Sequence, residues 1–132
     1  MKIEKFEDLD IWQEARKLSR LIFEITCKEP FCKDFRLRDQ IRASSGSVMD
    51  NIAEGFERGG NKEFIQFLSF AKGSCGECRS QSCRALDYIY IQEDVFMDLK
   101  IRTTQLSMKI SKLISYLKGT TMKGSKFKNP EP

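Results

Sequence analysis

Residues 40–56 read QIRASSGSVMDNIAEGF, and this stretch decides which class of fold the chain adopts. It follows a helical pattern, yet five consecutive positions, Ala43 to Ser47, carry very small side chains, and serine and glycine are poor helix formers. Small side chains allow a neighbouring helix to approach closely. The stretch therefore predicts a helix whose small residues form a packing seam with another helix.

At 100° per residue, the apolar and small positions of this helix fall on one stripe, which consists of Leu37, Ile41, Ser44, Ser45, Val48, Ile52, Gly55 and Phe56. Polar side chains line one edge of that stripe: Gln40, Ser47, Asn51, Glu54 and Arg58. Polar groups at a helix–helix seam need hydrogen-bond partners. We therefore expect a structural polar network here, joined by Ser74 and Glu77 from a later helix.

Apolar residues recur with helical spacing along four segments, and we expect helices over residues 9–28, 34–57, 62–89 and 93–118. The sequence also supplies their ends, because Pro30 stops the first helix, Gly59 stops the second, and Asp34 and Asn61 are suitable N-caps. No segment alternates with a period of two. Short connections between long helices predict an all-α fold, an antiparallel up-down-up-down four-helix bundle over residues 1–118. Residues 119–132 are rich in Gly, Lys, Ser and Pro and are expected to form a disordered basic tail.

The composition limits where the protein works. No run of 18 apolar residues is present, so we expect no membrane span. The N-terminus lacks the apolar core of a secretory signal, which favours a cytoplasmic protein. Five cysteines, an odd number, then indicate reduced thiols and not a disulfide framework.

The chain contains no histidine, which excludes Ser-His-Asp and Cys-His catalytic pairs and histidine-ligated metals. A carboxylate pair such as Glu54 and Glu77 lacks the Glu-x-x-His motifs of di-iron bundles. Cys75 and Cys78 form a Cys-x-x-Cys pair, for which core packing and a metal or redox role are the alternatives. We favour core packing, because both cysteines lie on an apolar stripe. We expect no metal, no cofactor and no enzymatic activity.

Some of these motifs also carry a resemblance to a known family. From about Phe6 to Lys118, the chain resembles the four-helix-bundle proteins encoded by intervening sequences of bacterial 23S rRNA genes, whose relatives include the accessory variability protein of diversity-generating retroelements. The matching positions are Phe6, Leu9, Trp12, Ala15, Gln40 to Arg42, Ser47, Asn51 to Phe56, Arg58, Ala71 to Ser74 and Glu77. The chain departs from the family pattern at Ala43, where the family often carries arginine, and at Cys78, where it often carries leucine.

The resemblance implies a partner and an assembly state. Members of the family look like closed ring oligomers, commonly pentamers. The implied ligand is RNA or an RNA–protein assembly, and in the retroelement branch a reverse transcriptase is an implied partner.

A second edge of the third predicted helix carries aromatic residues outside the core stripe. Phe67, Phe70, Gln81 and Tyr88 fall roughly 60–120° from that stripe. Either the core stripe is wide, or this edge is a subunit interface, since exposed apolar strips tend to mark association sites. A ring requires contacts between two different faces of the subunit, so we expect these residues to form the interface of a homo-oligomer.

Charge is divided unevenly along the chain. Residues 1–98 hold 15 basic and 18 acidic side chains, whereas residues 99–132 hold eight basic and one acidic. Such asymmetry indicates a polyanionic partner. Helical spacing places Arg102, Lys109, Lys112 and Tyr116 on one basic edge of the fourth predicted helix. The candidates for phosphate contacts, with one tyrosine for base stacking, are Arg38, Arg42, Arg102, Lys109, Lys112, Tyr116, Lys118 and Lys123.

Two functional classes compete, and an enzyme is a third that no motif supports. The favoured class is a non-enzymatic, oligomeric accessory protein that binds nucleic acid, with RNA preferred, mainly through phosphate contacts. The alternative is a protein-interaction scaffold with no nucleic-acid role, which would use the aromatic edge. Salt dependence separates the two, because phosphate contacts release counterions and weaken as salt rises.

Overall fold

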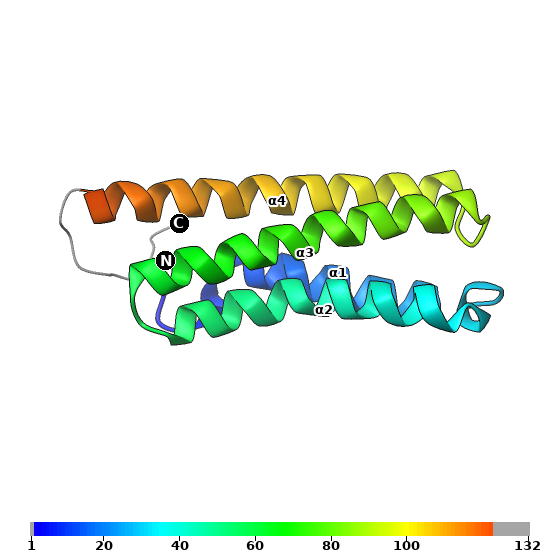
Figure 1. The fold of residues 1–132 in the computed structure, drawn as a ribbon, viewed down its shortest axis with the longest axis horizontal. Helices are drawn as coiled ribbons and strands as arrows, with labels where there is room; N and C mark the ends of the chain where they lie inside the picture. The colour runs from blue at the N-terminus through cyan, green and yellow to red at the C-terminus, as the bar shows by residue number, and fades with distance from the viewer. Residues whose placement is uncertain (1, 123–132) are drawn as a thin grey trace.

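The computed structural model describes residues 2–122 of the chain. Over this range the chain forms four long helices, α1 (Asp10–Thr26), α2 (Phe35–Glu57), α3 (Asn61–Asp87) and α4 (Glu93–Met122), with short 3-10 turns η1 (Phe6–Asp8) and η2 (Phe31–Lys33) before α1 and α2. The helices lie side by side along the long axis, and consecutive helices run in opposite directions (Figure 1). The expected antiparallel four-helix bundle is confirmed, and residues 2–122 contain no strand.

The turns on either side of α2 follow from local sequence signals. Asp34 caps α2, because its carboxylate accepts a hydrogen bond from the backbone N–H of Leu37 at 3.1 Å. Gly59 follows α2 with a φ of +85°, which glycine adopts without strain, and turns the chain into α3. The N-cap of α3 is Gly60 and not Asn61, so that expectation was wrong. The Asn61 side chain turns inward instead and donates to the carbonyl of Leu117 at 3.4 Å.

The C-terminal end of α3 differs from the expected one. The helix ends at Asp87, and Ile89, which we expected inside the helix, adopts a φ of +62° and is 73% exposed. The backbone N–H groups of Ile89 and Tyr90 bond to the carbonyls of Leu86 and Ala85 at 3.0 and 2.9 Å. This pair of hydrogen bonds is a Schellman motif, and it turns Ile89 away from the core.

The last helix is longer than the sequence predicted. α4 continues to Met122, four residues past Lys118, where we expected the bundle to give way to the tail. The predicted disordered tail otherwise lies outside the described residues. No helix in the described part of the chain is both long and apolar enough to cross a membrane.

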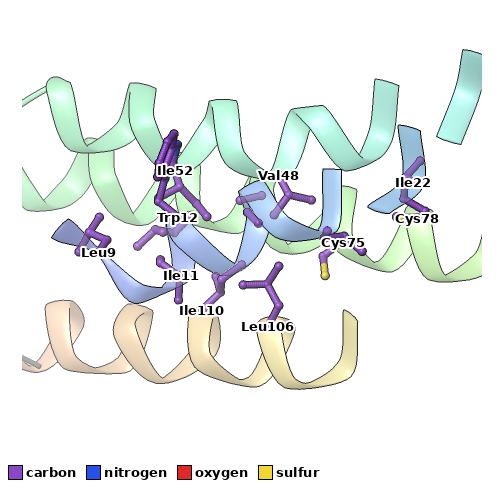
Figure 2. Packing of buried hydrophobic residues seen from close by; sticks show 14 of the residues in the cluster. Leu9, Ile11, Trp12, Ile22, Val48, Ile52, Cys75, Cys78, Leu106 and Ile110 are labelled. Atoms are coloured by element: carbon purple, nitrogen blue, oxygen red, sulfur yellow. The ribbon is translucent and has the colours of Figure 1, made fainter. Parts of the chain in front are cut away.

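The core lies between the inner faces of the four helices. Side chains of the four helices and of Leu9, the N-cap of α1, converge on it in Figure 2, among them Ile11, Trp12, Val48, Ile52, Cys75, Leu106 and Ile110. Every residue of the stripe predicted for α2 is buried. The apolar pattern therefore identified the buried face of α2, including its two buried serines, Ser44 and Ser45.

The predicted packing seam joins α2 to α3. A Cβ atom placed on Gly55 would lie 2.6 Å from Cβ of Phe67 and 3.1 Å from Cδ1 of Phe64. Real Cβ atoms do not approach a neighbour so closely, so glycine at this position permits the contact between the two helices. The edge-to-face contact of Phe64 with Phe56, 5.8 Å between ring centroids, closes the same end of the seam.

Candidate nucleic-acid interface

The basic edge predicted on α4 is partly neutralised by carboxylates. Arg102 pairs with Asp98 at 3.0 Å, one turn earlier on the same helix. Lys109 pairs with Asp10, the first residue of α1, at 2.8 Å. The hydrogen bond with Asp10 raises the pKa of Lys109 above its ordinary value. Two of the three cations on the predicted edge therefore already have anionic partners within the subunit.

This edge faces α1. Near the N-terminal end of α4, the surface between α1 and α4 is acidic. A shallow groove of about 380 Å³ there is lined by Glu24, Asp94 and Asp98, with Lys28 as the one cation among its charged lining residues. A polyanion approaching this side of the bundle meets an excess of like charge. The electrostatics of this surface do not favour phosphate contacts.

The two arginines predicted on α2 also have intramolecular partners. Arg38 donates to Asp39 at 2.9 Å and to the carbonyl of Cys32 at 3.2 Å, and the bond with Asp39 raises the pKa of Arg38. Arg42 donates to Oγ1 of Thr26 at 2.7 Å, and its guanidinium lies 4.6 Å from the centre of the Phe23 ring. Both arginines tie α2 to the region around the α1–α2 turn, which is a structural role.

The remaining candidates lie at the C-terminal part of α4. Lys112, Tyr116 and Lys118 are exposed, and Tyr116 retains 49% of its accessible surface. Helical spacing separates them, because Lys112 and Tyr116 share the edge that faces α1 whereas Lys118 points toward α3. Lys123 lies outside the described residues.

The predicted polar network is present in separate pieces along α2 and α3. Its centre is a chain of three side chains, in which Asn51 donates to Oγ of Ser47 at 2.9 Å and Ser74 donates to the same oxygen at 3.0 Å. Glu54 and Arg58 form an exposed pair at 3.0 Å that does not join this chain. The central chain crosses from α2 to α3 and helps to fix how the two helices meet.

Gln40 and Glu77 form two further pieces. Gln40 accepts a hydrogen bond from Arg84 of α3 at 3.3 Å on the surface. Glu77 accepts one from Gln81, one turn later on α3, at 3.4 Å. These contacts satisfy polar side chains locally, and they are not linked to the Ser47 chain by any hydrogen bond in the described residues.

Gln81 was expected at a subunit interface, and that prediction was wrong. The residue is only 6% exposed, and its Oε1 accepts a hydrogen bond from Oγ of Ser44 at 2.6 Å inside the α2–α3 seam. Helical spacing placed Ser44 on the apolar stripe, where no polar partner was expected for it. A polar residue beside a helix stripe can face inward when a small hydroxyl-bearing residue stands opposite, as Ser44 does here.

The other three residues of the predicted interface form an aromatic strip along α3 and its C-cap residue, consisting of Phe67, Phe70 and Tyr88. Phe67 is half-buried and meets Phe70 edge-to-face, with 5.7 Å between ring centroids. Phe70 and Tyr88 each keep 50% of their surface exposed. Arg58 lies 5.1 Å from the centre of the Phe67 ring. The apolar surface of α3 therefore extends beyond its buried stripe, and part of it is exposed to solvent.

Cys75 and Cys78 lie in the core, as the favoured interpretation placed them. Both are fully buried, and burial raises the pKa of Cys75 to about 11 and that of Cys78 to about 12. Thiols with such pKa values are protonated and inert at neutral pH. Among residues 2–122, no group of three or more ligand-type side chains is placed to hold a metal ion.

The fold and its charge pattern define a small helical-bundle protein whose last helix is cationic and whose third helix carries an exposed aromatic strip. The model of one protein family, described as 23S rRNA-intervening sequence protein, matches residues 7–112. The chain therefore belongs to this family. No match was found among curated proteins.

Proposed function

We propose that this protein is a non-enzymatic accessory protein that binds RNA, mainly through contacts between its cationic side chains and phosphates. The family description associates the chain with 23S rRNA genes, which supports an RNA-associated role. The observation that carries the proposal is the charge of α4. After Asp98, no Asp or Glu occurs in the remaining described part of this helix, which holds five cations.

Phosphate contacts need cationic side chains that are not already paired with a carboxylate of the protein. Lys112 and Lys118 project from α4 into solvent, and the exposed ring of Tyr116 can stack on a base. A surface of this kind binds the RNA backbone without sequence specificity, because lysine side chains contact phosphates without reading base edges.

We further propose that the protein is a homo-oligomer, and that the aromatic strip forms part of the contact between subunits. Tyr88, the C-cap residue of α3, follows Phe70 by eighteen residues, which is five helical turns, so the two residues lie on the same side of the helix. Half-exposed aromatic side chains on one face are typical of association sites. A ring of subunits, such as a pentamer, would repeat the cations of α4 and strengthen RNA binding through multivalency.

The binding experiment uses a fluorescein-labelled RNA hairpin with a single-stranded tail and a labelled DNA duplex, measured by fluorescence anisotropy in low-salt buffer. We expect submicromolar binding to the RNA and weaker binding to the duplex. Absence of RNA binding at low salt would contradict the proposed function and favour the alternative, a protein-interaction scaffold that uses the aromatic strip.

The assembly is tested separately by light scattering at micromolar protein concentration. We expect a mass that is a multiple of the subunit mass, and a decrease in that mass when Phe70→Glu places a charge in the aromatic strip. A monomeric mass for the unaltered protein would contradict the oligomer.

A further inference from the structure

A second groove runs between α3 and α4, on the side of α4 that faces away from α1. It has a volume of about 620 Å³ and takes its lining from both helices, which lie side by side in Figure 1. Three cations line it, Lys72 and Arg79 from α3 and Lys118 from α4. None of its described lining residues is a carboxylate, and four of them are serines.

The cations are spaced along the groove and not clustered at one point. Lys72 and Arg79 are seven residues apart, which is two turns or about 10 Å along α3. Lys118 lies near the start of α3, because neighbouring Leu117 contacts Asn61 across the two helices. Lys100 lies five turns before Lys118 on the same face of α4 and extends the positive surface toward the other end.

The floor of the groove allows an extended ligand to come close to the backbone of α3. Gly73 and Gly76 present bare backbone there, and a Cβ atom added at either position would meet no atom within 4 Å. Arg79 is oriented across the groove, since its guanidinium donates to Oγ1 of Thr104 on α4 at 3.4 Å. Serine hydroxyls and positioned guanidinium groups are typical donors to phosphate oxygens.

The two sides of α4 differ in the sign of their charge. The α1–α4 groove contains Glu24, Asp94 and Asp98, whereas the α3–α4 groove contains cations without a carboxylate. A helix from a protein partner would need apolar contacts to bury, and Ile114 is the one large apolar side chain that lines the α3–α4 groove. The charge and polarity of this groove fit a polyanion better than a protein helix.

We propose that the α3–α4 groove holds the sugar–phosphate backbone of an RNA strand, with Lys72, Arg79 and Lys118 contacting phosphates spaced along the strand. This inference rests on the proposed RNA-binding function and gives that function a location. It moves the site from the α1-facing edge of α4 to the opposite side, and it adds two residues of α3 that the charge pattern of α4 alone does not reveal.

The first test removes the charges of the groove. The variant Lys72→Gln, Arg79→Gln, Lys118→Gln is titrated into the labelled RNA hairpin by anisotropy. We expect at least a tenfold loss of affinity at low salt and a salt slope shallower by about 2, since each lost phosphate contact reduces the slope by roughly 0.7 to 0.9.

A matched control removes three charges from the α1-facing side of the bundle. The variant Lys28→Gln, Arg102→Gln, Lys109→Gln has the same net charge as the groove variant, so any difference between them reports location and not total charge. We expect this control to lose less than threefold. Equal losses in the two variants, or a larger loss in the control, would overturn the groove assignment while leaving RNA binding itself intact.

A steric variant tests the groove without changing charge. Gly76→Gln places a side chain in open space above α3, so the bundle should keep its helical content by circular dichroism. We expect a loss of RNA affinity of about tenfold or more. Unchanged affinity in this variant would overturn the groove assignment, and a wild-type protein that fails to bind RNA at low salt would overturn the proposed function as well.

Discussion

The two glycines inside α2 are expected to respond differently to alanine. A Cβ atom at Gly46 would meet nothing within 4 Å, whereas a Cβ atom at Gly55 would lie 2.6 Å from Cβ of Phe67. Both glycines lie within the same helix, so they share the same backbone conformation and the same gain in helix propensity. The pair therefore isolates the effect of the contact between α2 and α3.

The expected magnitudes follow from these two terms. Alanine in a helix interior is favoured over glycine by about 1 kcal/mol, so Gly46→Ala should raise the free energy of unfolding by roughly that amount. At Gly55 the same gain is opposed by overpacking, which typically costs about 1–3 kcal/mol. The clashing atom of Phe67 is its Cβ, which is fixed to the α3 backbone and cannot rotate away. Gly55→Ala should therefore be less stable than Gly46→Ala by about 1–3 kcal/mol.

Urea unfolding followed by far-UV circular dichroism measures both variants, at one protein concentration because the protein is expected to associate. We expect the midpoint of Gly46→Ala to lie above that of the wild type and the midpoint of Gly55→Ala to lie below that of Gly46→Ala, with unchanged slopes. Equal stabilisation by the two substitutions would refute the reasoning, because it would mean that α2 and α3 do not approach closely at Gly55.

Three further outcomes follow from buried and capping groups. Ser44→Ala should lower stability by about 1–3 kcal/mol, because it leaves the buried Oε1 of Gln81 without its 2.6 Å hydrogen bond, and an unchanged urea midpoint would contradict that hydrogen bond. Cys75 and Cys78, with pKa values of about 11 and 12, should resist alkylation at pH 8 while the surface cysteines react. Mass spectrometry of the native protein measures the alkylation rates, and equal rates for buried and surface cysteines would show that the core is open to the reagent. The hydrogen bonds from the backbone N–H of Leu37 and from the hydroxyl of Tyr90 lower the pKa of Asp34. The stabilisation by the Asp34 carboxylate is therefore present above its ordinary pKa of 3.8 and is lost as the pH falls through the lower folded value. Asp34→Asn should therefore flatten the decline of the urea midpoint between pH 5 and pH 2, and parallel declines would refute this role.

The sequence predicted the bundle well because each helix carries its own signals. The stripe of α2 became buried at every position, and Asp34 caps this helix as expected. Such features depend on residues within one helix, whose spacing determines which of them share a face. Ile89 was misplaced because apolar character does not reveal that the chain has left the helix; its left-handed conformation is set by the hydrogen bonds that close α3.

The candidate site was harder to predict because it depends on contacts between helices. Spacing placed Arg102 and Lys109 correctly on one edge of α4, but it could not show that this edge meets Asp10 of α1. Lys72 and Lys118 are 46 residues apart and come together only because α3 and α4 run antiparallel. A signal was present in the sequence, since the α4-facing side of α3 combines glycines with cations. It could not be recognised as part of a groove without knowing how the helices are ordered in the bundle and how each is rotated about its axis.

The most direct test of the central claim is the dependence of RNA affinity on salt. Anisotropy titrations of the wild-type protein with the labelled hairpin, at several salt concentrations between about 50 and 200 mM, give the slope of log affinity against log salt. Three phosphate contacts predict a slope of about −2 or steeper, because each contact with a single strand contributes roughly −0.7. A slope near zero would contradict the claim that phosphate contacts hold the RNA.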